Sequence, residues 1–74
     1  MGRLAGFKYH EVARRLRAFG YFFDRHGPGS HEVWRDPVTR RKVTVPHHAK
    51  DIAEGTLRTI LRDAGIPVQE FLNE

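Results

Sequence analysis

The sequence predicts a small α+β domain in which a helix is followed by three antiparallel strands, a second helix and a short C-terminal helix. Two observations predict this order. Apolar residues recur at helical spacing toward both ends of the chain, and three short segments rich in aromatic and β-branched residues lie between them, separated by turns with Gly or Pro. A chain of 74 residues forms one domain, so residues 1–74 are expected to share a single thin core.

The first helix is expected from Phe7 onward, with Gly20 as its stop, because apolar residues there follow the spacing of one helical face. This stripe consists of Tyr9, Val12, Ala13, Leu16 and Phe19. Gly20 suits the position directly after a helix, where a positive φ is common. Residues 1–6 show no clear period and are expected to be flexible.

Three strands are expected, at residues 21–25, 31–35 and 41–45. A turn at residues 26–30 separates the first two strands, and Gly27 and Gly29 can adopt a positive φ there at low cost. Pro37 marks the next turn and Pro46 ends the third strand, because proline cannot donate to a strand ladder. Consecutive strands joined by short loops pair most simply as an antiparallel meander.

A second helix is expected to open near Asp51, because Asp51 and Glu54 have the spacing of a capping box. Its apolar stripe consists of Leu57, Ile60, Leu61 and Ala64. Gly65 is expected to end this helix, with Ile66 making the apolar contact of a Schellman cap. A last short helix is expected over residues 67–73, since proline suits a first helical turn.

Helices on one face of a three-stranded sheet leave the other face free. That arrangement resembles the double-stranded-RNA-binding fold, whose order is α-β-β-β-α. The positive charge is also concentrated. Between Arg25 and Lys50 the chain has six basic and two acidic residues, which accounts for its whole net charge of +4. Such a segment suits a nucleic-acid partner, and it equally suits a solvated strand edge that basic side chains protect from aggregation.

The composition excludes several classes of protein. The chain has no cysteine, so it has no disulfide and no thiolate metal site. Its apolar runs are far shorter than the ~20 residues that span a bilayer, and the N-terminal residues lack the apolar run of a secretory signal. A cytoplasmic protein without a membrane partner is therefore expected. No phosphate-binding loop, dinucleotide fingerprint or nucleophile elbow occurs, so no cofactor is expected.

His31 is the candidate catalytic residue. It follows Gly29 and Ser30 in a tight turn and opens a strand inside the basic segment. An imidazole titrates near neutral pH, so it can take the proton of an RNA 2′-hydroxyl or protonate the leaving oxygen without a metal ion. On local sequence alone, a solvated histidine in an exposed turn is the commoner explanation. The nuclease hypothesis requires an exposed His31 ring close to lysine or arginine side chains.

The candidate contacts to RNA phosphates are Lys42, Arg35, Arg41 and His47. Cations on neighbouring strands stabilise the negative charge that develops at phosphorus. His47 and His48 are adjacent in an extended segment, so their side chains point to opposite sides and no metal site is expected.

Two further clusters have both a structural and a functional explanation. The aromatic cluster consists of Tyr21, Phe22, Phe23 and Trp34. It suits a platform for stacking bases, although aromatic residues at strand spacing in a small domain more often form the core. The cluster of Arg14, Arg15 and Arg17 suits a solvated helix face, a phosphate contact or a docking site for an acidic partner.

Several pieces of the chain match one known family in order and spacing. They are Phe19-Gly20-Tyr21, Gly29-Ser30-His31, Trp34-Arg35-Asp36-Pro37, Val43-Thr44-Val45-Pro46-His47, Lys50-Asp51-Ile52 and the stretch from Gly55 to Ile66. Through these pieces the chain resembles the HicA-type (YcfA-like) mRNA interferase toxins from Tyr9 to about Gly65. Each piece is modest alone, but together they are specific.

The resemblance implies a double-stranded-RNA-binding-like fold, endoribonucleolytic cleavage of messenger RNA that stops translation, and a HicB-type antitoxin as partner. It also implies that His31 is the catalytic residue and Gly29 the motif glycine. Many members carry a second histidine directly after the first, where this chain has Glu32. Adjacent residues of a strand face opposite ways, so we expect no contact between Glu32 and His31.

Two other hypotheses remain open at this stage. One is a non-catalytic double-stranded-RNA-binding domain that uses the same basic face. The other is an interaction module whose basic surface docks an acidic protein.

Overall fold

The computed structural model describes residues 3–74 and has the predicted order of elements. These are α1 Tyr9–Ala18, β1 Phe22–His26, β2 His31–Arg35, β3 Lys42–Pro46, α2 Glu54–Ala64 and α3 Val68–Leu72. The strands form one antiparallel sheet in the order β1-β2-β3. The predicted fold class is therefore confirmed, and β2 has the predicted bounds.

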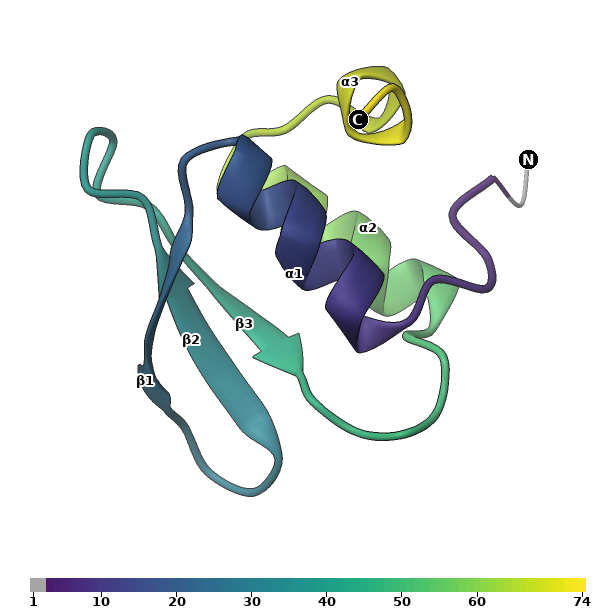
Figure 1. Cartoon of the computed structure of the whole chain (residues 1–74), viewed down its shortest axis with the longest axis horizontal. Helices are drawn as coiled ribbons and strands as arrows, with labels where there is room; N and C mark the ends of the chain where they lie inside the picture. Colours follow the sequence, from purple (N-terminus) through teal and green to yellow (C-terminus); the bar gives the residue numbers. More distant parts are fainter. Residues whose placement is uncertain (1–2) are drawn as a thin grey trace.

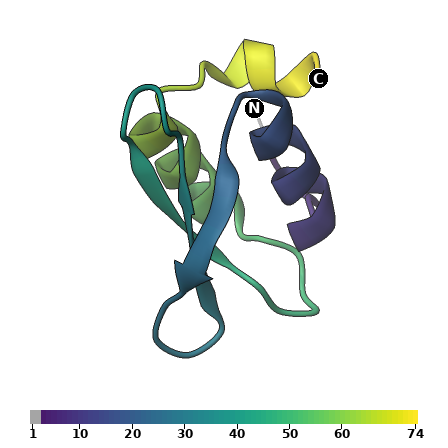
Figure 2. The same cartoon turned by 60° about the vertical axis from the view of Figure 1, so that its left-hand side comes forward.

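Both long helices cover the same face of the sheet and leave the other face open (Figures 1 and 2). The apolar side chains on the covered face of the sheet are buried against the apolar stripes of α1 and α2. The strands contribute Trp34, Val43 and Val45 to this core. Alternation along β2 and β3 places His31, Arg35, Lys42 and Thr44 on the open face. One polar sheet surface is thus available for a ligand.

The aromatic cluster divides between the core and the surface. Tyr21 and Trp34 are buried, whereas Phe22 and Phe23 on β1 are 42% and 40% exposed. Trp34 lies at the centre of the covered face, and its ring packs edge to face with Phe23. The core explanation therefore holds for Tyr21 and Trp34, which are the members beside the helices.

Two arginines of the α1 cluster pack against aromatic rings. The Arg15 guanidinium lies 5.0 Å from the Phe7 ring centre and 5.3 Å from that of Phe71, and it donates a hydrogen bond to the Phe71 carbonyl. Arg17 lies 5.0 Å from the centre of the Trp34 ring. These side chains join α1 to α3 and to the sheet through cation–π contacts.

The edge strand β1 contains a bulge. Its pairing with β2 shifts between Phe23 and Arg25, so Asp24 is the additional residue. The Asp24 carboxylate forms ion pairs with Arg25 and, at 3.7 Å, with Arg35. The bulge therefore brings an acidic group beside Arg35.

The N-terminal segment is attached to the core. Residues 3–6 form turns, and Leu4 is fully buried in the core cluster. Met1 and Gly2, which belong to the segment expected to be flexible, lie outside the described residues. Within residues 3–74, none of the helices has the length and apolar character needed to cross a membrane.

The predicted start of α2 is wrong. The helix begins at Glu54 with Ala53 as its N-cap, and no side chain caps it. Asp51 instead accepts a hydrogen bond from Lys8 Nζ at 2.7 Å. The reason is that Ile52 is buried and its N–H donates to the Phe7 carbonyl, which keeps this segment extended.

The predicted end of α2 is confirmed. Gly65 has φ +73°, and the Ile66 N–H donates to the Leu61 carbonyl as in a Schellman cap. The Arg41 guanidinium lies beside this cap, with Cζ 3.1 Å from the position of a Cβ atom on Gly65.

We predict that Gly65→Ala lowers the free energy of unfolding by about 1–2 kcal/mol, because an L-residue is strained at this positive φ. Urea denaturation followed by Trp34 fluorescence measures the change. The matched control is Gly55→Ala, which has open space around the new Cβ and should stabilise α2 by about 0.5–1 kcal/mol. Equal stability of the two variants would contradict the role of the Gly65 conformation.

Candidate functional site

His31 opens β2 at the end of a tight turn. Gly29 is in the left-handed region with φ +64°, whereas the φ of Gly27 is not positive. The His31 N–H donates to the Pro28 carbonyl, and the Gly27 N–H donates to the His31 carbonyl. These bonds close the loop around His31, while the residue itself is exposed. The requirement for an accessible imidazole is met.

A pocket of about 470 Å³ lies beside His31 at the end of the sheet. Among its lining residues are His31, Thr44, His48, Lys50, Asp51 and Thr56. The pocket lies where the segment after β3 leads into α2. His31 and Lys50 therefore border the same pocket, so one ligand seated there meets both side chains.

The open face of the sheet carries two of the predicted phosphate contacts. Arg35 and Lys42 are paired in register on β2 and β3. Lys42 is exposed, and Arg35 is half-buried beside Asp24. Arg35 lies four positions after His31, which corresponds to about 13 Å along a strand. A polyanion on this face can therefore reach both the cations and the histidine.

Arg41 is directed elsewhere. Its Nη1 donates to the Asp63 carbonyl at 3.2 Å, near the C-terminal end of α2. A cation there offsets the negative end of the helix dipole. The structure thus gives Arg41 a contact to α2 and separates it from the pair formed by Arg35 and Lys42.

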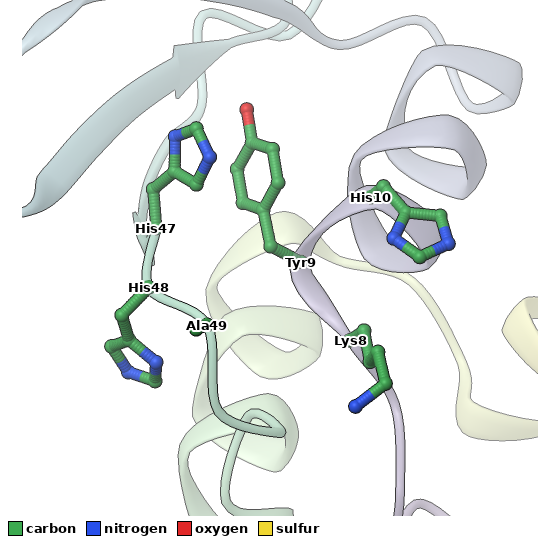
Figure 3. A pocket seen from close by; sticks show the side chains of 6 residues that line it. All are labelled: Lys8, Tyr9, His10, His47, His48 and Ala49. Atoms are coloured by element: carbon green, nitrogen blue, oxygen red, sulfur yellow. The ribbon is translucent and has the colours of Figure 1, made fainter.

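His47 lies on the side of the sheet opposite to His31. Its Nδ1 is 2.9 Å from Glu32 Oε2, and its ring is stacked on Tyr9 with ring centres 3.7 Å apart. Figure 3 shows these two rings side by side, while the rings of His48 and His10 point away from them. His47 therefore links β3 to α1 rather than joining the basic open face.

The Glu32 carboxylate is buried, with only 5% of the residue exposed. Tyr9 Oη donates to Oε1 at 2.6 Å, and Trp34 Nε1 donates to the same oxygen at 3.1 Å. Because an ionised carboxylate only accepts hydrogen bonds, the proton between Glu32 and His47 resides on His47 Nδ1. Glu32 points to the side of β2 opposite to His31, as strand alternation predicts.

The hydrogen bonds determine the charge state of this cluster. Burial alone raises the pKa of Glu32, but the hydrogen bonds from Tyr9, His47 and Trp34 outweigh it and lower this pKa below its ordinary value of 4.5. Burial and the neighbouring Glu32 raise the pKa of Tyr9 to about 12. At neutral pH the cluster therefore combines a carboxylate with a protonated phenol.

The fold and the site define the class of this protein: a small α-β-β-β-α domain with an open sheet and an exposed histidine at the sheet's end. The family model of the HicA toxin of bacterial toxin–antitoxin systems matches residues 9–66. This match spans most of the chain, so the protein belongs to the HicA toxin family. A comparison with curated proteins finds no match.

Sequence reasoning did not identify the Glu32 cluster or the position of His48. Strand alternation indicates only that Glu32 and His31 face opposite ways, whereas two partners of Glu32 come from α1 and from the residue after β3. The sequence pairs His48 only with its neighbour His47, whereas its place at the pocket of His31 depends on how the chain leaves β3. Within residues 3–74, no three His, Asp or Glu side chains converge in a metal-binding arrangement.

We predict that Glu32→Gln removes a pH-dependent part of the stability. Because the folded-state pKa of Glu32 is lowered, the ionised group stabilises the fold above pH 4.5, and this contribution is lost as the pH falls through the folded-state pKa. At pH 7 the free energy of unfolding of the wild type should be about 1–3 kcal/mol higher than that of the variant, and this difference should narrow at pH 3.

Urea denaturation at both pH values measures this difference. Glu70→Gln on α3 is the control, because Glu70 is exposed and its replacement should change stability by less than about 0.5 kcal/mol. A gap between wild type and Glu32→Gln that stays constant from pH 7 to pH 3 would contradict the assigned role of the carboxylate.

Proposed function

We propose that this protein is an endoribonuclease that cleaves messenger RNA and thereby stops translation, with His31 as the catalytic residue. The observation that carries the proposal is the exposed His31 beside a pocket that contains Lys50, at the end of a sheet face that presents Arg35 and Lys42. Membership of the HicA toxin family supports the same activity. An enzyme that acts on translated messages works in the cytoplasm.

The proposed chemistry uses only groups of the protein and of the RNA. The 2′-hydroxyl attacks the neighbouring phosphorus, and the imidazole of His31 either accepts the proton of that hydroxyl or supplies a proton to the leaving oxygen. Nearby cations stabilise the negative charge on the phosphorus oxygens. The turn formed by Gly29 and Ser30 holds the histidine at the end of β2, where a long polymer can approach from the open face.

We propose a HicB-type antitoxin as the protein partner. The family is that of the toxin in a toxin–antitoxin system, so a neutralising partner is expected. The exposed basic groups around His31 supply a surface that such a partner can mask.

We predict that His31→Ala lowers the rate of RNA cleavage by about 10²–10⁴-fold, because it removes the proton-transfer group. The assay incubates the protein with RNA of mixed sequence in the presence of a chelator and separates the fragments by electrophoresis. Circular dichroism verifies that the variant stays folded, as expected for an exposed side chain.

His26→Ala is the matched control, since His26 is an exposed histidine at the other end of the same turn. It should cleave at the wild-type rate. Binding of RNA without cleavage by the wild type would favour a non-catalytic RNA-binding domain. If the wild type neither binds nor cleaves RNA at low salt, an interaction module for an acidic protein is favoured.

We predict that Lys42→Gln weakens RNA binding and reduces its dependence on salt. Each phosphate contact to single-stranded RNA contributes about 0.7 to the slope of log K against log salt, so the slope should fall by about this amount. Titrations of fluorescent RNA at several salt concentrations measure the slope, using the His31→Ala variant as background to avoid cleavage.

The control is Arg62→Gln, which makes the same change of charge on the exposed surface of α2. It should leave the slope unchanged. Equal effects of the two substitutions would show that only net charge matters, and the assignment of the open face would then be wrong.

A further inference from the structure

The pocket beside His31 contains a second imidazole. His48 lines this pocket together with His31 and Lys50. Both histidines are exposed, so both rings are accessible to a ligand. RNA cleavage through the 2′-hydroxyl involves two proton transfers, which makes a pair of histidines at one pocket chemically significant.

The alternation of the chain explains why His48, rather than His47, accompanies His31. His31 is paired in register with Pro46, so these residues share one face of the sheet. The next residue, His47, points to the other face, where it contacts Glu32 and Tyr9. His48 then returns to the side of His31, and Figure 3 shows its ring directed away from Tyr9.

The two histidines belong to one hydrogen-bonded unit. The His47 N–H donates to the Ser30 carbonyl at 2.8 Å. Because His47 precedes His48 and Ser30 precedes His31, this bond holds the two backbone segments that carry the histidines together. The side chain of His47 is held as well, because its ring is bound to the buried Glu32 and stacked on Tyr9. The segment that presents His48 is therefore anchored on both its backbone and its side chain.

The charges around His48 favour an anionic ligand. Lys50 and Asp51 line the pocket with both histidines, and Asp51 is already paired with Lys8 at 2.7 Å. On its other side, His48 shares a second pocket with Lys8, Tyr9, His10, His47 and Ala49. The Asp51 carboxylate is thus compensated by Lys8. Lys50 therefore gives the pocket a positive charge that suits a phosphate.

We propose that His48 is a second catalytic residue and forms a complementary acid–base pair with His31. This inference rests on the proposed ribonuclease function. One imidazole accepts the proton of the 2′-hydroxyl while its oxygen bonds to phosphorus. The other imidazolium donates a proton to the 5′-oxygen as the bond between phosphorus and that oxygen breaks. The products are a 2′,3′-cyclic phosphate and a 5′-hydroxyl, and no further reactant is consumed.

The test uses an RNA oligonucleotide whose cleavage position is first mapped with the wild-type protein. A second oligonucleotide carries sulfur in place of the 5′-oxygen at that position, so its leaving group needs no protonation. His48→Ala should lose about 10²–10⁴-fold of the rate on the oxygen substrate, and His48→Gln should lose as much. His10→Ala is the control, because the pocket that His31 and His48 share is not lined by His10, and it should retain the wild-type rate.

The sulfur substrate should restore most of the lost rate in only one of the two variants His31→Ala and His48→Ala, namely the one that lacks the acid. Restoration in neither or in both would overturn the pairing. Wild-type cleavage by His48→Ala, or recovery of activity in His48→Gln, would overturn the role of His48 and leave the proposed function intact. Absence of cleavage by the wild-type protein would instead remove the proposed function itself, and this inference with it.

Discussion

The buried carboxylate of Glu32 connects the three parts of the fold that surround the site. It accepts hydrogen bonds from Tyr9 on α1, from Trp34 on its own strand and from His47 directly after β3. A charged group in the core is costly unless such partners compensate its lost hydration. Because Tyr9 and His47 lie far from Glu32 in the sequence, their convergence on its carboxylate aligns α1 with the end of the sheet.

This cluster also has an effect on the opposite face of the sheet. Residues of one extended segment alternate in direction, so holding His47 against Tyr9 directs the following residue to the other side. The bond from His47 N–H to the Ser30 carbonyl joins that segment to the turn of His31. His47 therefore belongs to the buried cluster, while the next residue, His48, faces the pocket of His31. In this way the buried cluster fixes the position of the histidine that the pocket exposes.

Local patterns in the sequence predicted most of the fold. The helical stripes, the glycine that ends α2 and the bounds of β2 depend on neighbouring residues, and the structure confirms them. The predicted start of α2 is wrong because the hydrogen bond from Ile52 N–H to the Phe7 carbonyl, which is distant in sequence, prevails over the local capping motif of Asp51 and Glu54. The position of His31 was predictable from its turn, whereas the partners of Glu32 and the surroundings of His48 depend on tertiary packing that spacing does not encode.

The bulge in β1 has a consequence for the colloidal behaviour of the protein. An edge strand with an uninterrupted row of N–H and C=O groups serves as a template onto which another molecule can add its own strand. The additional residue Asp24 interrupts that row directly after the two partly exposed residues Phe22 and Phe23, and it places a carboxylate there. A bulge and a charged side chain on an edge strand both oppose such pairing, so this irregular residue protects the exposed edge beside Phe22 and Phe23.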